Sequence, residues 1–233
     1  PVKFGISFTT SFLNQAGALV NIYKDGTVLV NHGGTEMGQG LHTKIGQIAA
    51  AELGVDLENI KVNATNTSKV PNTSATAASA GTDLNGMAVK NAVDKLKRRI
   101  GKVVLEAWRE GAARDRSTPL TVTTSELEGK LIFKDNYVIN KDNPDQKMAF
   151  KDAVLKAYFA QTSLSATGFY KTPDIHYDKD KGKGKPFHYF SFGIAVTEVQ
   201  LDTLTGYHRI TRADILHDVG DSLNPRIDIG QVE

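Results

Sequence analysis

Alternating hydrophobic and polar positions predict a β-hairpin near the start of the chain. Residues 16–23 alternate as a strand, Lys24-Asp25-Gly26 has the composition of a tight turn, and residues 27–31 predict the returning strand. A second hairpin is predicted from residues 187–202 and 207–219, joined by another glycine-containing turn. Strands are therefore expected toward both ends of the sequence.

Between these hairpins, apolar residues recur at the spacing that is typical of amphipathic helices. Apolar residues recur at helical spacing between Leu41 and Leu53, and Gly54 is placed to end that helix. A second apolar line starts near Thr82 or Asp83 and predicts a helix toward Trp108. The remaining expectations are a helix over 147–160, strands within 59–64, 120–138 and 163–172, and a charged surface loop over 174–185.

This order of strands, helices and further strands predicts an α+β fold with two lobes, in which mixed sheets carry flanking helices. We place the first lobe at residues 1–161 and the start of a second, truncated lobe at residues 162–233. Because the sequence begins with Pro1 and stops directly after Gly230-Gln231-Val232-Glu233, we expect it to be a piece of a longer chain.

Composition narrows the classes of function. Lys and Arg number 28 against 26 Asp and Glu, so the formal net charge of +2 gives no electrostatic reason to expect nucleic acid or an anionic membrane as a partner. The chain has no cysteine, which excludes disulfides, thiolate zinc sites and iron–sulfur clusters held by these residues. No run approaches the roughly 18 apolar residues of a membrane span. We therefore expect a globular protein of the cytoplasm.

Two polar loops that lead into helices are the main candidates for binding. The first, residues 33–40, is rich in glycine, which lets a ligand approach the backbone, and the following helix start offers N–H groups to an anion. The second, residues 65–82, also ends at a helix start, so both could converge on one extended, phosphate-bearing ligand. Their spacing matches neither standard nucleotide-binding motif. By themselves these residues leave a tight turn and a solvated loop as alternatives.

Other candidate groups point to structural roles. The six histidines show no metal-ligand spacing and are interpreted as surface or capped residues. Glu36 and Glu198 are candidate acids without a partner in the sequence, and both are interpreted as structural. The basic stretch from Lys95 to Arg99 is interpreted as a solvated helix face. The Gly-x-Ser-x-Gly elbow of many hydrolases does not occur.

Longer strings carry a family resemblance across nearly the whole chain. They are Gly34–Lys44, Val70–Ser79, Asp83–Gly86, Leu164–Pro173, Pro186–Phe190 and Asp218–Glu233. In this order they resemble the molybdopterin-binding subunit of the molybdenum hydroxylases, the family of xanthine and aldehyde oxidoreductases. Leu164–Pro173 and Phe187–Phe190 resemble the xanthine dehydrogenase branch of that family in particular.

The resemblance implies which residues hold the cofactor, a molybdenum-molybdopterin. Met37, Gly38 and Gln39 are expected to contact the pterin, as is Gln231. The segment expected to wrap the cofactor with its backbone comprises Thr76, Ala77, Ala78, Ser79, Ala80, Gly81 and Thr82. Ala78 and Gln39 are expected near the molybdenum, which the cofactor's dithiolene carries, so no side chain is expected as a metal ligand. If both loops serve one cofactor, they must lie side by side at two helix N-termini.

The resemblance also implies hydroxylation of a purine, from hypoxanthine to xanthine to urate, with electrons leaving through 2Fe-2S clusters and FAD to NAD. Those centres and the remaining lobes of the molybdenum subunit would belong to other parts of a homo-oligomeric enzyme. The family's general-base glutamate lies in a Gly-Glu-Pro-Pro motif that this sequence lacks, so no catalytic residue is assigned and the chain alone is expected to be inactive. Aldehyde oxidase or another heterocycle hydroxylase, and a non-catalytic assembly module on the same fold, remain alternatives.

Overall fold

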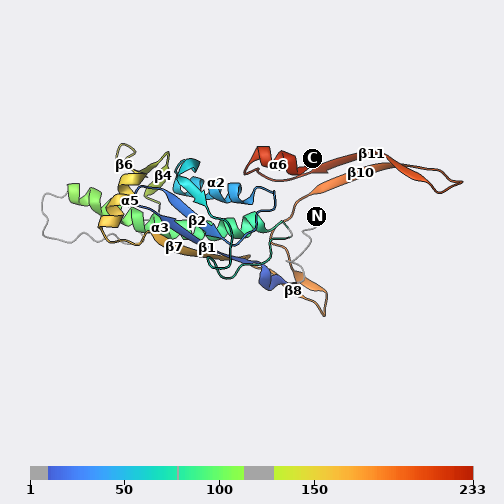
Figure 1. Ribbon diagram of the computed structural model, residues 1–233, viewed down its shortest axis with the longest axis horizontal. Coiled ribbons are helices and arrows are strands. Elements are labelled where there is room, and N and C mark those ends of the chain that lie inside the picture. Colours follow the sequence, from blue (N-terminus) through green and yellow to red (C-terminus); the bar gives the residue numbers. More distant parts are fainter. Residues whose placement is uncertain (1–9, 78, 113–128, 233) are drawn as a thin grey trace. The chain divides into compact units, whose positions relative to one another are not determined.

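The computed structural model describes residues 10–77, 79–112 and 129–232. The chain divides into two units, one of residues 12–172 and one that contains residues 173–233 (Figure 1). Ala78 and residues 120–128 of the expected strand region lie outside the described residues.

A four-stranded mixed sheet organises the unit of residues 12–172. Its strand order is β3 (Ile60–Val62), β2 (Val28–His32), β1 (Gln15–Ile22) and β7 (Ser165–Lys171). β1 is antiparallel to both neighbours, as the predicted first hairpin requires. β3 runs parallel to β2 because helix α2 (Leu41–Leu53) connects the two strands as a crossover.

The described part of this unit also contains two further helices and a small sheet. Helix α3 (Gly81–Ala112) is long, and α5 (Phe150–Phe159) is short. A separate antiparallel sheet consists of β4 (Leu131–Lys134), β5 (Tyr137–Asn140) and β6 (Lys147–Ala149). Single 3₁₀ turns occupy Ser11–Leu13 and Leu57–Asn59. The expected α+β architecture of mixed sheets with flanking helices is confirmed.

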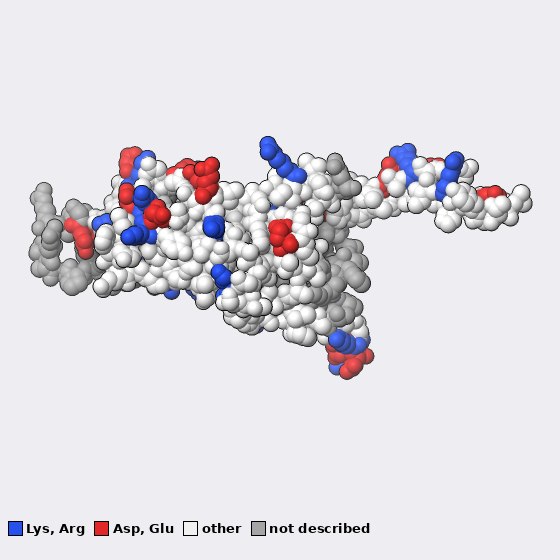
Figure 2. Space-filling view, viewed as in Figure 1, with Lys and Arg blue, Asp and Glu red and all other residues white. Residues whose placement is uncertain are grey.

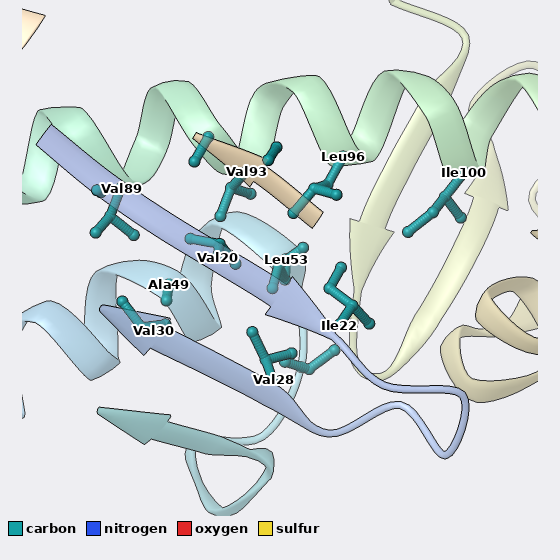
Figure 3. Close-up of a cluster of buried hydrophobic side chains, with 14 of the residues drawn as sticks. Val20, Ile22, Val28, Val30, Ala49, Leu53, Val89, Val93, Leu96 and Ile100 are labelled. Atoms are coloured by element: carbon teal, nitrogen blue, oxygen red, sulfur yellow. The ribbon is translucent and has the colours of Figure 1, made fainter. Parts of the chain in front are cut away.

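One face of the large sheet carries the hydrophobic core. Every second residue of β1 from Ala16 to Ile22 is buried there, and α2 and α3 supply the residues that face it. The side chains labelled in Figure 3 come from β1, β2, α2 and α3 and point toward one another: Val20, Ile22, Val28, Val30, Ala49, Leu53, Val89, Val93, Leu96 and Ile100. This layer packs both helices against the sheet and so fixes their position on it.

Helix α3 touches strand β7 backbone to backbone at Gly168. A side chain at Gly168 would overlap the carbonyl oxygen of Ala88 and would lie 2.7 Å from the backbone nitrogen of Ala92. Glycine therefore permits a contact between helix and strand that any other residue would prevent.

Polar and basic side chains of α3 donate hydrogen bonds to backbone carbonyl oxygens along the free edge of β7. Asn91 donates to the carbonyl oxygen of Phe169 at 2.8 Å, Lys95 to that of Thr167 at 2.8 Å, and Arg99 to that of Ser165 at 2.7 Å. β7 is the last strand of the sheet, so these carbonyls have no strand partner. The interpretation of Lys95 and Arg99 as part of a merely solvated face was wrong.

Two segments differ from the prediction. The helix expected over 147–160 begins at Phe150, because residues 147–149 pair with β5 as strand β6. The loop over 174–185 contains a short hairpin of β8 (His176–Asp178) and β9 (Lys183–Lys185). β7 belongs to the unit of residues 12–172 because it pairs with β1 along its whole length. The placement of two lobes at 1–161 and 162–233 stays a prediction.

The unit that contains residues 173–233 holds the second predicted hairpin, which is confirmed. Its strands are β10 (Gly193–Leu201) and β11 (His208–His217), with an irregularity between Glu198 and Val199. Helix α6 (Pro225–Val232) follows. Glu198 accepts a hydrogen bond from the Thr211 hydroxyl at 2.9 Å, which fits its interpretation as structural.

The distribution of surface charge and the hydropathy of the helices agree with the expectations from the composition. Figure 2 shows Lys and Arg interspersed with Asp and Glu on this face rather than gathered into a patch of one sign. Within the described ranges, no helix combines the length and apolar character that a membrane span needs.

Candidate cofactor-binding site

The two loops predicted to bind the cofactor lie side by side, and that prediction is confirmed. The backbone N–H of Thr35 donates to the hydroxyl oxygen of Thr76 at 2.8 Å, which joins the first loop to the second. A side chain built at Gly81, the first residue of α3, would be 3.6 Å from Leu41, the first residue of α2. Both loops therefore end at helix N-termini that adjoin each other.

Glycines make this close packing possible. A side chain at Gly33 would overlap Thr73 of the second loop. One at Gly34 would lie 2.5 Å from Leu41 and 2.8 Å from the Asn85 amide nitrogen of α3. The glycine-rich composition of the first loop therefore serves contacts behind the loop as well as an open face in front of it.

Glu36 occupies the N-terminus of α2. One carboxylate oxygen accepts the backbone N–H groups of Gly38 and Gly40, each at 3.0 Å, and the other accepts that of His42 at 2.9 Å. Partial desolvation raises the pKa of Glu36, but these backbone N–H groups and the nearby His42 outweigh it and lower the pKa below its ordinary value. The interpretation of Glu36 as structural is confirmed. These N–H groups were expected to bind an external anion. That expectation is corrected, because the carboxylate of Glu36 already accepts hydrogen bonds from them.

Gln39 folds back onto the first loop. Its side-chain oxygen accepts the Met37 N–H at 2.6 Å, and its side-chain nitrogen donates to the Thr35 carbonyl at 2.9 Å. Both ends of the amide are therefore used within the loop, which makes Gln39 a residue that shapes the loop in this structure.

The outer face of the first loop is open. Met37 is 65% exposed, and Gly38 has a φ of +99° with no atom within 4 Å of the position that a side chain would take. A bulky ligand can reach the backbone at Gly38 without displacing a side chain, so the residues present fit an extended pterin.

The second loop presents its exposed edge in the same region. Ala77 and Ser79 are exposed, and Ala78 lies outside the described residues. Ser79 has a φ of +57°, a left-handed conformation that is uncommon outside glycine and that recurs at functional sites. A cavity of about 10 Å³, lined in part by Thr73, Thr76 and Asn85, lies beside this loop and is too small for a pterin.

Buried polar groups lie behind the first loop and were missed by the sequence analysis. His32, at the end of β2, is only 1% exposed, so its interpretation as a surface or capped residue was wrong. His32 Nε2, His42 Nε2 and Asn85 Oδ1 are buried and have no hydrogen-bond partner among the described residues. The signal in the sequence is that His32 directly precedes the glycine loop, at the point where the buried face of β2 ends.

Gln231 does not belong to the unit that contains these two loops. It is exposed on α6, in the unit that contains residues 173–233. Its contact with the pterin stays a prediction. Within the described ranges, no cluster of His, Asp and Glu is suited to hold a metal ion.

The fold and this pair of loops define a class of protein. All 233 residues match the family of molybdopterin cofactor-binding domains, and the chain belongs to that family. Over 233 residues it is 48% identical to the xanthine dehydrogenase/oxidase of Gallus gallus, and over 236 aligned positions it is 46% identical to the xanthine dehydrogenase of Dictyostelium discoideum. Both alignments cover the whole chain, which spans 14% and 15% of the length of those relatives.

Solved structures share the fold. The chain is similar to quinoline 2-oxidoreductase from Pseudomonas putida 86, with a TM-score of 0.70 and 23% identity over 94% of this chain and 25% of that one. It is similar to the CO dehydrogenase of Oligotropha carboxidovorans, also with a TM-score of 0.70, with 24% identity over 93% of this chain and 24% of that one. Because these identities are below 25%, the similarity shows a shared fold only.

The Thr35–Thr76 hydrogen bond allows a test of the paired loops. In the full-length protein, Thr76→Val keeps the size of the side chain but leaves the Thr35 N–H without its acceptor. A lost hydrogen bond of about 1 kcal/mol corresponds to roughly fivefold weaker cofactor binding. Molybdenum and pterin per polypeptide, measured after dialysis, should fall accordingly. Thr76→Ser restores the hydroxyl and should restore retention; equal loss in both variants would contradict a role for this hydrogen bond.

Proposed function

We propose that this chain is the molybdopterin-binding part of a xanthine dehydrogenase, which oxidises hypoxanthine to xanthine and xanthine to urate. The observation that carries the proposal is the identity of 48% to a xanthine dehydrogenase/oxidase, sustained over all 233 residues. It is supported by the confirmed pairing of two glycine- and alanine-rich loops at adjoining helix N-termini.

The residues of this chain would hold and orient the cofactor. The open backbone around Gly38 would receive the pterin, with Met37 beside it and with Gln39 and Glu36 keeping the loop in shape. The segment from Thr76 to Thr82, in which Ala77 and Ser79 are exposed, would form the second wall, and Gln231 would add a contact. The bound cofactor would supply the redox chemistry of hydroxylation, and no residue of this chain is proposed as a catalytic acid or base.

The rest of the enzyme would come from outside this chain. Because the chain spans only 14% to 15% of its relatives, further lobes, 2Fe-2S clusters, FAD and the purine-binding residues are proposed to lie in other segments or subunits. A homo-oligomeric enzyme in the cytoplasm, with NAD as electron acceptor, is proposed on the family resemblance.

Two alternatives differ in what they predict. An aldehyde oxidase or another heterocycle hydroxylase of the same family would use the same loops. A non-catalytic assembly module would retain the fold without needing molybdenum.

The proposal is tested with the full-length protein purified with its cofactor. Steady-state urate formation from xanthine is measured beside oxidation of benzaldehyde and of quinoline, with molybdenum and pterin content determined in the same sample. Urate formation with molybdenum present is the expected result. Preference for benzaldehyde or quinoline would favour the first alternative, and absence of molybdenum would favour the second.

The isolated chain provides a further prediction. Residues 1–233 alone are expected to form no urate, because removal of a general base and of transition-state contacts together costs roughly several powers of ten in rate. Sustained turnover by the isolated chain would place catalytic residues within it and would contradict the proposal that they lie in other segments of the enzyme.

A further inference from the structure

His32 joins three elements behind the glycine loop. It lies at the end of β2, and its Nδ1 accepts the backbone N–H of Gly34 at 3.0 Å. Its ring meets the ring of His42, in the first turn of α2, edge to face with centroids 5.1 Å apart. The Asn85 side chain of α3 faces it from the third side. One buried side chain therefore contacts the loop and the first turns of both helices.

The hydrogen bond to Gly34 determines the state of the ring. Nδ1 can accept this N–H only if it carries no proton, so the ring must be neutral with its hydrogen on Nε2. A proton added at Nδ1 would point a donor at the Gly34 N–H. The contact that ties the loop to β2 would then be lost.

The surroundings disfavour that proton. Burial is the largest cause that lowers the pKa of His32 from 6.5 to about 4; His42 also lowers this pKa, and Glu36 and Asn85 raise it by less. These are the titratable and polar groups that face the ring from the loop, α2 and α3. Glu36 is not the source of a change between pH 7 and 5, because its own pKa lies below its ordinary value.

We propose that neutral His32 is a positioning residue that holds residues 33–40 against α3 in the conformation that retains the cofactor, and that its protonation releases the loop. The hold of His32 on the loop and its loss on protonation concern the chain itself. The link to cofactor retention rests on the proposed function of the loop, so the two are measured separately.

Acid should open the loop by a calculable amount. In the opened loop the ring is solvated and has its ordinary pKa of 6.5, whereas in the closed loop it has a pKa of about 4. The closed state is therefore favoured fully above pH 6.5 and loses this advantage as the pH falls toward 4. Between pH 7.5 and pH 5 the opened fraction should rise roughly 30-fold by proton linkage.

The test compares His32→Asn with His32→Leu in the full-length, cofactor-free protein. The asparagine oxygen takes the place of Nδ1 as an acceptor but does not titrate, whereas leucine removes the acceptor. Hydrogen exchange of peptides that cover residues 33–41 is measured at pH 7.5 and 5 and corrected for the intrinsic pH dependence of exchange. We expect an acid-induced rise in the parent, protection at both values in His32→Asn, and fast exchange at both values in His32→Leu. His208→Leu, at an exposed histidine, should behave as the parent does.

Each outcome has a distinct meaning. A rise with acid that persists in His32→Asn would assign the response to another group, such as His42, and would overturn the proposal. Protection in His32→Leu at pH 7.5 would overturn the positioning role. Molybdenum and pterin retention at the two pH values is then measured in the cofactor-loaded protein. An opened loop that keeps its cofactor would overturn the link to retention and the proposed function of the loop, while leaving the role of His32 in the chain intact.

Discussion

Replacing Gly38 by valine in the full-length protein is expected to abolish most molybdenum retention. Gly38 has a φ of +99°, a conformation that L-residues rarely adopt and that a β-branched side chain resists most. The backbone would have to leave this region, and the hydrogen bond from the Gly38 N–H to Glu36 would be lost with it. The valine side chain would also project into the space where the loop is open to a ligand.

The expected loss is at least roughly tenfold in molybdenum per polypeptide, since a left-handed conformation costs about 1–2 kcal/mol for a residue with a Cβ and the lost cap adds to it. Gly38→Ala should lie between the parent and Gly38→Val. Lys181→Ala, on an exposed side chain of the other unit, should retain the parent content. Equal molybdenum in Gly38→Val and parent, each measured by metal analysis, would remove this loop from the cofactor site.

Gly168→Ala is expected to cause a large loss of stability in the unit of residues 12–172. Its Cβ would overlap the Ala88 carbonyl oxygen, so α3 and β7 would have to separate along a contact that buries much of the core. Overpacking of this kind costs about 3 kcal/mol, at the upper end of its usual range, because neither backbone can rotate away as a side chain can. The displacement would also draw Asn91, Lys95 and Arg99 from the carbonyls of β7.

Gly46→Ala is the matched control for Gly168→Ala. Gly46 is also buried, but a methyl group there would meet Leu57 at 3.4 Å and Val62 at 3.5 Å, which are ordinary contacts. Alanine at this interior position of α2 should be neutral or slightly stabilising. Thermal unfolding gives the size of each effect, and hydrogen exchange of peptides from α3 and β7 gives its location. Similar melting temperatures for Gly168→Ala and Gly46→Ala would mean that helix and strand are not in direct contact.

Much of the local structure was predictable because it depends on neighbours in the sequence. The hairpin at Lys24-Asp25-Gly26 follows from turn chemistry between alternating strands, and the end of α2 at Gly54 follows from the left-handed conformation that Gly54 adopts. The positions of both loops before helices followed in the same way. Their assignment to a cofactor came from the family resemblance, since glycine and small polar residues by themselves are equally compatible with a tight turn.

The errors arose where a residue's role depends on partners distant in the sequence. Lys95 and Arg99 look like solvated charges until β7, more than sixty residues later, places its free carbonyls beside them. The position of His32 at the end of a buried strand is a weak signal, and its burial is completed only where α2 and α3 pack against it.

The hairpins, the order of the elements and, through the longer strings, the family could be predicted from the amino-acid sequence. Those properties follow from periodicity, turn composition and the identity of contiguous residues, all of which act over a few positions. The folded chain was needed to show that two loops, whose hydrogen-bonded residues Thr35 and Thr76 are 41 positions apart, form one surface, and that a buried histidine lies behind it. Packing between segments that are distant in the sequence determines which polar groups are buried and which backbone segments are in contact. Neither property can be predicted from the residues adjacent to one position.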